Sequence, residues 1–295
     1  MEPTVTIPTN VHILFVKNRK AVKGAQHKMK TSSLRGAYVR GLACVIFLPL
    51  VCASVVSATV LVSVVSDQVL VIASDGAMYR HDISGKVTGK EPSCKIRLVG
   101  NQVVAHAGLV FEGSAQFDFW RSVGSVSSAS TSEFVSMLSA MLSERLEEVA
   151  RARRGKNLSQ PDYRLTRIEV YVAGWDPDLT LFELVATLPV DGVPVIKKTR
   201  VWPMWDEGKN PPSFARGGIY QVNYFGSFDE NIRSNNDEWI SVSADPLKYA
   251  GFEVQKQIDG GNQSVGSPVT VVRIDKSGPK WVELGACHDQ GQGHY

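Results

Sequence analysis

The segment Thr59–Ala77, "TVLVSVVSDQVLVIASDGA", decides the fold class. Its two apolar, β-branched runs, Thr59–Ser66 and Gln68–Ser74, each have the length of a buried strand. Ser66-Asp67 between them is typical of a turn. The segment therefore predicts a hairpin of two core strands that ends at Asp75-Gly76.

The segment before the hairpin has the three-part layout of a secretory signal peptide. After Met29, three basic residues precede an apolar stretch, Leu42–Val55, and Val56-Ser57-Ala58 is a small-residue cleavage site. We therefore expect residues 29–58 to be removed after Ala58 by signal peptidase, and the body to be periplasmic or secreted. Either Met1 or Met29 can be the start of the chain.

A membrane anchor is the alternative. No charged residue occurs between Arg40 and Asp67, and the 25 uncharged residues Leu42–Ser66 are enough to span a bilayer. Positive charges on the N-terminal side would place the body outside the cytoplasm. The β-branched second half of this stretch favours a strand, and hence a cut, over an anchor.

Composition separates the leader from the body. Residues 1–58 carry eight Lys and Arg against one acid, a net charge of +7, which leaves residues 59–295 with 24 bases against 28 acids, or −4. An acidic body argues against nucleic acid as a partner. Cys94 and Cys287 are the two cysteines of the body, and they are either a disulfide or two buried thiols.

Downstream patterns place the remaining elements. Helices are expected over 112–125, 130–155 and 246–258, the second of them opened by a Ser130/Glu133 capping box. Strands are expected over 167–175, 179–188, 193–202, 218–226, 269–275 and 280–284. This order suits an α+β fold in which two antiparallel sheets lie between helical layers.

Cleavage after Ala58 would give Thr59 a chemical role. An N-terminal threonine combines a nucleophilic Oγ with its own α-amine, a base with a pKa of about 7.7–8.0. Asp75 follows sixteen residues later and Lys95 twenty after that. A nearby Lys95 would favour the neutral amine, and Asp75 would hold Lys95 in place. Each of the three also fits a plain role, as a strand residue, a turn acid and a solvated charge.

These residues resemble the start of a proteasome-type β-subunit, and of the bacterial HslV peptidase in particular. The family pattern falls on Thr59, Asp75-Gly76 and Lys95, and Ala107-Gly108 matches the position that supplies an oxyanion-hole N–H. The likeness continues at "YVAGWDP" (171–177) and "GGNQSVGSPVTVVRID" (260–275), so that it covers most of residues 59–285.

The sequence departs from the family pattern in two places. The interval from Asp75 to Lys95 is about four residues longer, and Ala58 stands where self-processing members have Gly, which fits a cut by signal peptidase. The resemblance implies two further site residues: Asp259, near the position of the acid that supports the threonine amine, and Ser243, near the serine before the late helix.

The resemblance implies an N-terminal-nucleophile (Ntn) hydrolase with a four-layer αββα sandwich over 59–285 and a flexible tail over 286–295. We expect an exported threonine peptidase or amidase that acts through an acyl-enzyme on Thr59, with Gly108 as oxyanion donor, on a peptide or small amide. It would need no ATPase and no cofactor, and it could form a homo-oligomeric ring. No metal-binding motif occurs, and Cys287, His288 and His294 look like a loose tail. The alternative is a membrane-anchored, inactive subunit of the same fold that serves binding or assembly.

Overall fold

The computed structural model describes residues 54–57, 59–66, 69–81, 87–112, 115–128, 130–154, 167–188, 193–203, 219–232 and 245–287 of the 295-residue chain. All of them belong to one compact unit, Leu48–Tyr295. Among these residues, no helix is both long enough and apolar enough to cross a bilayer. Most of the expected leader lies outside the described residues.

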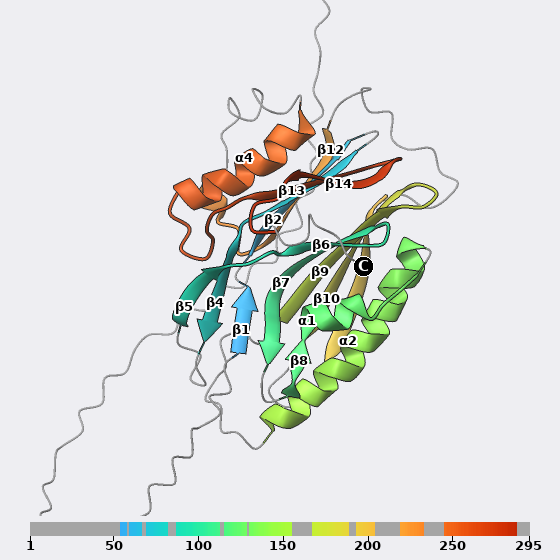
Figure 1. Ribbon diagram of the computed structural model, residues 1–295, viewed down its shortest axis with the longest axis vertical. Helices are drawn as coiled ribbons and strands as arrows, with labels where there is room; N and C mark the ends of the chain where they lie inside the picture. The colour runs from blue at the N-terminus through green and yellow to red at the C-terminus, as the bar shows by residue number, and fades with distance from the viewer. Residues whose placement is uncertain are drawn as a thin grey trace, which may run out of the picture. The chain divides into compact units, whose positions relative to one another are not determined.

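The hairpin predicted from Thr59–Ala77 forms the centre of a five-stranded antiparallel sheet. β2 (Val60–Ser66) pairs with β3 (Leu70–Ser74), and every residue of both strands is buried. The strand order is β12-β2-β3-β13-β14 (Figure 1), with β12 over Ile219–Gly226, β13 over Thr270–Asp275 and β14 over Gly278–Glu283.

Both faces of this sheet are covered, which explains why its central strands are apolar throughout. Alternate residues of a strand point to opposite faces. Val60 and Val62 pack against α4 (Pro246–Asp259), whereas Leu61 and Val65 pack against a second sheet.

The second sheet has nine strands, all paired antiparallel, in the order β11-β10-β9-β7-β1-β4-β5, with β6 and β8 also paired to β7. The strands are β1 (Ser54–Ser57), β4 (Ala77–His81), β5 (Val87–Pro92), β6 (Ile96–Val99), β7 (Gln102–Glu112), β8 (Phe117–Asp118), β9 (Arg167–Trp175), β10 (Leu179–Thr187) and β11 (Val195–Trp202).

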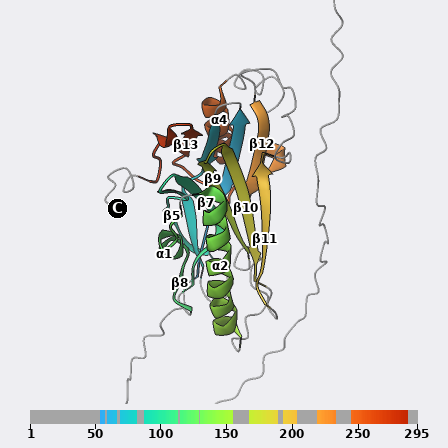
Figure 2. The same ribbon diagram turned by 90° about the vertical axis from the view of Figure 1, so that its right-hand side faces the viewer.

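Two helices cover the outer face of the nine-stranded sheet. α2 (Thr131–Arg153) lies along β9, β10 and β11 (Figure 2), and α1 (Phe119–Gly124) lies against β7. The Ser130 hydroxyl caps α2 by accepting from the Glu133 N–H at 3.1 Å, which confirms half of the predicted capping box. The Glu133 carboxylate instead accepts from the Ser128 hydroxyl at 2.7 Å.

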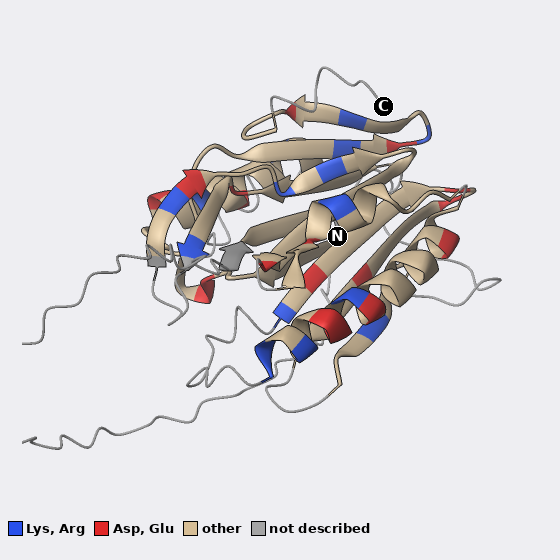
Figure 3. Cartoon of the chain, turned by 60° about the horizontal axis from the view of Figure 1, so that its bottom comes forward, with Lys and Arg blue, Asp and Glu red and all other residues tan. Residues whose placement is uncertain are grey.

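Charged side chains of both signs are interspersed on the outer surface. Figure 3 shows that acidic and basic residues occur together in the C-terminal half of α2, where Arg145 and Glu148 form an ion pair at 3.0 Å. A short 3-10 helix, Glu230–Ile232, follows β12.

The expected architecture is therefore confirmed at the level of a mixed α/β fold with two antiparallel sheets and few helices.

Three features of the structure were not anticipated from the sequence. Residues Ser54–Ser57, expected to leave with the leader, form strand β1 inside the nine-stranded sheet. The ribbon β4–β5 was not expected at all. The Ala286 N–H donates to Thr270 at 3.4 Å and Cys287 is buried, although both residues fall within the stretch expected to be a flexible tail.

Candidate active site

Thr59 lies where the chain passes from one sheet to the other. β1, which ends at Ser57, belongs to the nine-stranded sheet, and β2, which begins at Val60, belongs to the five-stranded sheet. Thr59 is 1% exposed, and its carbonyl oxygen accepts from the Ser227 N–H at 2.7 Å. Gly226 has a φ of +77°, and a Cβ there would come within 1.9 Å of the Thr59 oxygen. Only glycine permits this approach.

Asp75 follows β3 directly and connects the elements of the site. One carboxylate oxygen accepts from the Val60 N–H at 2.9 Å and from the Lys95 ammonium at 2.8 Å. The other accepts from the N–H groups of Ala77 at 3.1 Å and Gly266 at 3.0 Å. Asp75 is fully buried, so these four donors replace the water that the carboxylate loses on folding. Asp75 therefore holds the Lys95 ammonium beside Val60, the residue that follows Thr59 and begins β2.

Lys95 is the buried cation of the site. Its ion pair with Asp75 joins two side chains that are 1% and 0% exposed. Burial lowers the pKa of Lys95 below its usual value, while the charge of Asp75 opposes that shift and nearby Lys90 adds to it. A lysine with a lowered pKa holds its proton less firmly, so it is suited to share a proton with a hydroxyl.

His106 anchors Lys95 from the neighbouring strand. Its N–H donates to the Lys95 carbonyl at 3.0 Å, and its ring Nε2 donates to the Leu109 carbonyl at 3.0 Å. The ring lies 4.1 Å from that of Phe119, in the helix-side core. Burial lowers the pKa of His106 to about 3, so the ring is neutral at physiological pH.

Gly108 lies in β7 beside strand β1. Its Cα partners are Ser57 of β1 and Ile168 of β9, and Ser57 is two residues before Thr59. With a φ of +96°, a Cβ at Gly108 would come within 2.1 Å of the Arg167 carbonyl oxygen. The position expected to supply an oxyanion donor is therefore one that only glycine can occupy, next to the candidate nucleophile.

Of the two further residues implied by the resemblance, the structure describes only Asp259, and it does not join this cluster. Asp259 is the exposed last residue of α4, and its carboxylate accepts from the Gln255 side chain at 2.7 Å. Ser243 lies outside the described residues. The structure thus brings Asp75 and Lys95 together beside the strand of Thr59 and places Gly108 nearby.

A glycine-rich turn supplies contacts that sequence reasoning did not assign. The Asn262 side chain donates to the Ser227 carbonyl at 2.8 Å, and Gly266 binds Asp75 through its N–H and accepts from the Gly76 N–H at 2.7 Å. The only signal in the sequence was the string "GGNQSVG" within the family resemblance, since backbone donors leave no mark on residue identity.

The same turn is held from the β4–β5 ribbon. The Tyr79 hydroxyl donates to the Gln263 carbonyl at 2.5 Å, and the Lys90 ammonium donates to the Val265 carbonyl at 2.9 Å. Tyr79 and Lys90 are paired across β4 and β5. The ribbon therefore helps to position Gly266, one of the four donors to Asp75.

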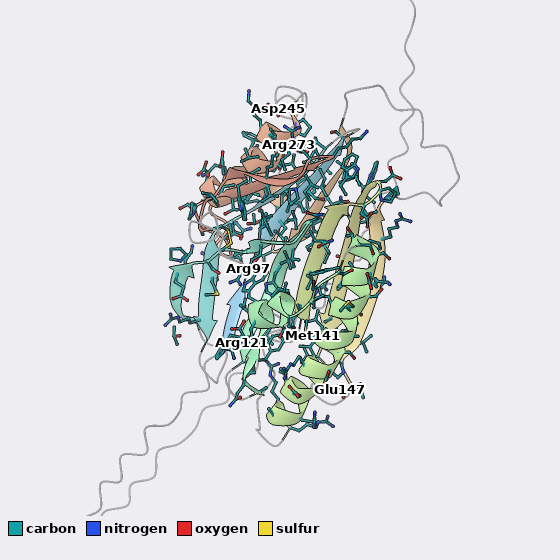
Figure 4. All side chains as sticks on the ribbon, turned by 45° about the vertical axis from the view of Figure 1, so that its right-hand side comes forward. Arg97, Arg121, Met141, Glu147, Asp245 and Arg273 are labelled. Atoms are coloured by element: carbon teal, nitrogen blue, oxygen red, sulfur yellow. A yellow bond between two sulfur atoms is a disulfide. The ribbon has the colours of Figure 1, made fainter. Side chains whose placement is uncertain are left out.

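Strand β1 fills the space between β4 and β7. Val56 is paired with Tyr79 on one side and with Leu109 on the other, and no direct pairing joins β4 to β7 in the described sheet. Removal of the leader would leave two open strand edges facing each other beside Thr59. Two open grooves lie elsewhere: one is lined by Asp245 and Arg273 (Figure 4), the other includes Asp259, and neither is lined by Thr59, Asp75, Lys95 or Gly108.

The two cysteines of the body form a disulfide, which settles the alternative left open by the sequence. Cys94 and Cys287 have Cα atoms 4.7 Å apart, and Cys94 directly precedes Lys95. Within the described residues, no group of three or more His, Cys, Asp and Glu side chains is placed to hold a metal ion.

No protein-family model matches the chain, and no curated protein matches it. Solved structures similar to it include Thiobacillus denitrificans BPH in complex with epoxomicin, at 16% identity and a TM-score of 0.42, covering 74% of this chain and 98% of that one. They also include the Gly-1 mutant of Anbu from Hyphomicrobium sp. strain MC1 (TM-score 0.46) and Anbu, an ancestral beta-subunit, from Yersinia bercovieri (TM-score 0.45). Each of these two is 13% identical and covers 76% of this chain and 87% of its own. At such identities and TM-scores the likeness carries no argument about activity, which has to come from the site.

Proposed function

We propose that the chain is an exported threonine-type Ntn hydrolase with the four-layer αββα fold, matured by cleavage after Ala58. The observation that carries the proposal is the Asp75 carboxylate, which binds the buried Lys95 ammonium and the Val60 N–H at once. A buried ion pair is costly unless it is fully hydrogen-bonded, and this one is completed by the backbone N–H groups of Ala77, Gly266 and Val60, the last of which directly follows Thr59.

The proposed reaction begins with the Thr59 α-amine as general base. It takes the Oγ proton while Oγ attacks the substrate carbonyl, and the N–H of Gly108 binds the resulting oxyanion. The tetrahedral intermediate collapses to an ester on Oγ, and the α-ammonium gives its proton to the departing amine. Water, deprotonated by the same amine, then hydrolyses the ester and restores the threonine.

Lys95 sets the protonation state of these groups. Its positive charge disfavours a second positive charge on the Thr59 amine, so it lowers the pKa of that amine and favours the basic form. Asp75 holds the lysine in place at 2.8 Å.

The position of β1 favours a peptide substrate over a small amide. The carbonyl that Thr59 attacks lies near its own nitrogen, so the acyl side of a substrate occupies the place of the departed leader. Between β4 and β7, an extended peptide can pair with both strand edges as β1 does. Short or unfolded peptides fit such a slot without an ATPase partner.

The disulfide supports export of the body. Disulfides persist in the periplasm and outside the cell and are rare in the cytosol. Signal peptidase would then be the maturing enzyme, and a homo-oligomeric ring is the assembly we propose to test by native mass measurement.

A second candidate function follows from the paired state of β1. If the leader is retained, Ser54–Ser57 occupies the slot and the Thr59 nitrogen is an amide that cannot act as a base. The chain would then be an inactive, membrane-anchored subunit for binding or assembly.

The decisive experiment combines N-terminal analysis with an active-site probe. The full chain is expressed in an exporting host, and the recovered protein is analysed by intact mass before and after treatment with a peptide epoxyketone, the class to which epoxomicin belongs. We expect a chain that starts at Thr59 and gains one inhibitor mass, and no gain in Thr59→Ala. A chain that starts at Thr59 and neither reacts nor hydrolyses any member of a peptide panel would refute the proposal. A chain that retains Ser54–Ala58 would support the anchored subunit.

A further inference from the structure

We infer that the Cys94–Cys287 disulfide positions Lys95, so that the enzyme is fully active only with this disulfide closed. The inference rests on the proposed function, because it concerns the same lysine. The disulfide, drawn as a yellow bond in Figure 4, joins residues that are 193 positions apart in the sequence. One of its ends is the residue directly before Lys95.

The chain around Lys95 is held at three consecutive points. The Ser93 N–H donates to the Gly76 carbonyl at 2.8 Å, Cys94 carries the disulfide, and the Lys95 carbonyl accepts from the His106 N–H at 3.0 Å. Strand β6 begins at the next residue. The link from β5 to β6 is therefore short, and the disulfide is its single covalent attachment to another part of the described chain.

The far end of the disulfide is fixed to the sheet that carries Asp75. The turn Leu284–Cys287 is closed by a bond from the Cys287 N–H to the Leu284 carbonyl at 2.7 Å. Thr270 of β13 holds this turn, since its hydroxyl donates to Leu284 at 3.3 Å and accepts from Ala286 at 3.4 Å. A Cβ on Gly285 would come within 2.3 Å of the same hydroxyl, so the turn lies directly on Thr270.

These contacts connect the two partners of the ion pair, Asp75 and Lys95, by a second path through the fold. Thr270 is paired with Ser74, the residue directly before Asp75. The path therefore runs from Asp75 through Thr270 and the turn to Cys287, across the disulfide to Cys94, and on to Lys95. Opening the disulfide interrupts this path next to Lys95 and leaves Asp75 in place.

The consequence for Lys95 is both geometric and electrostatic. Cys287 is 1% exposed and its sulfur lies 3.6 Å from the Ile96 carbonyl, so the turn covers the start of β6. When the turn is released, water reaches Lys95. Since burial is the main cause of the lowered pKa of Lys95, that pKa then rises toward its usual value. When the Lys95 ammonium is held less closely, its effect on the Thr59 amine is smaller, so the pKa of that amine is lowered by a smaller amount.

The test compares the exported, mature protein with its disulfide closed and opened. One sample is kept oxidised, one is treated with a reducing agent, and a third is the Cys94→Ser/Cys287→Ser double variant. The rate of covalent adduct formation per active site is measured with a peptide epoxyketone from pH 5 to 10, after active sites are counted by intact mass. We expect the reduced protein and the double variant to react about ten-fold or more slowly at pH 7, because small displacements of catalytic groups cost about that much or more. Their rate–pH profiles should move to higher pH, and reducing agent should not affect the double variant.

A matched control separates positioning from general stability. Leu138→Ala in α2 removes a fully buried side chain from the helix-side core, so it lowers stability without touching the disulfide or the site. It should reduce the fraction of folded sites and leave both the per-site rate and the pH profile unchanged. If the reduced protein behaves in the same way as Leu138→Ala, or as the oxidised protein, the disulfide has no positioning role and the inference is wrong. If the oxidised protein with an N-terminal Thr59 does not react at all, the proposed function itself fails.

Discussion

Replacing Asp75 by Asn is the sharpest test of the proposed site. The change keeps the size of the side chain and removes its charge. All four contacts of the Asp75 carboxylate are with donors, two on each oxygen. An amide can accept on one side only, so its NH₂ group must face either the pair Val60 and Lys95 or the pair Ala77 and Gly266.

The expected cost in folding free energy follows from these contacts. Leaving a buried donor without an acceptor costs about 1–3 kcal/mol, and stripping a buried charge of its partner costs about 3–5 kcal/mol. Lys95 is 1% exposed, so solvent does not screen its charge. We expect Asp75→Asn to lose about 4 kcal/mol of unfolding free energy at pH 7, a large part of the total for a typical domain. The rate of acylation on Thr59 should fall about 100-fold or more.

The pH dependence of the stability loss in Asp75→Asn tests whether Lys95 is its cause. Burial already lowers the pKa of Lys95, and the Asp75 charge is the main effect that opposes it. Without that charge the pKa falls further in the folded state, while in the unfolded state it stays near 10.4. The unfolded state then binds more protons between these two values, so stability rises with pH across that window. The deficit of Asp75→Asn relative to the parent protein should therefore shrink from pH 7 toward pH 10.

Urea unfolding at a series of pH values measures this deficit, and the rate at which Thr59 forms a covalent adduct with a peptide epoxyketone measures its reactivity. Glu147→Gln is the matched control, because it makes the same carboxylate-to-amide change on the exposed face of α2 (Figure 4). It should stay within about 0.5 kcal/mol of the parent protein. An Asp75→Asn protein that is as stable and as reactive as Glu147→Gln would show that the buried ion pair has neither role.

Four further outcomes are expected. Gly226→Ala should lose about 2 kcal/mol or more in urea unfolding and most of its acylation rate, because the new Cβ would lie 1.9 Å from the Thr59 oxygen at a φ of +77°; normal values would show that the Thr59 main chain can move at no cost. Asp259→Asn should acylate within about two-fold of the parent protein, since this residue is exposed and bonded only locally to Gln255 among the described contacts; a large loss would restore the role implied by the family resemblance. Unfolding free energy should fall by about 1.4 kcal/mol per pH unit as the pH drops from about 6.5 toward 3, because the folded-state pKa of His106 is lowered to about 3 and the unfolded state binds the proton first; a His106→Gln variant with the same slope would contradict this. Peptides with four residues on the acyl side should have kcat/KM about ten-fold or more above those with one, as pairing with β4 and β7 requires, and equal values would favour a small-amide substrate.

Local sequence patterns were enough to predict most of the fold. β2 and β3 follow from two β-branched runs around a turn, and α2 and α4 follow from helical spacing after Ser130 and Asp245. In each of these elements, the spacing of the apolar residues along the sequence already shows which faces are buried. The ribbon β4–β5 could not be predicted in this way, because polar and charged residues such as Arg80 and Lys90 alternate weakly along it and its position depends on partners far away in the chain.

The candidate site was predictable in its side chains and not in its backbone. Thr59, Asp75 and Lys95 stood out by residue type and spacing, and the ion pair between Asp75 and Lys95 confirms one part of that reasoning. The donors from Gly266 and Ser227 were missed, since any residue except proline offers an N–H and the contact depends only on the path of the chain. Asp259 has a suitable side chain near the expected spacing, but the sequence did not show that the end of α4 places it on the surface.

The place of β1 also constrains when the chain can be cut. Thr59 is 1% exposed, and the strands before and after it belong to two different sheets, so an external protease has no access to Thr59 once the sheets have formed. The proposed function therefore requires signal peptidase to act during export, before β1 pairs with β4 and β7. A chain that escapes this cut folds with its own leader in the slot, and the same sequence then gives the inactive form. Under the proposal, cleavage before folding gives the hydrolase, and folding before cleavage gives the inactive subunit. The order of these two steps therefore decides between the two candidate functions.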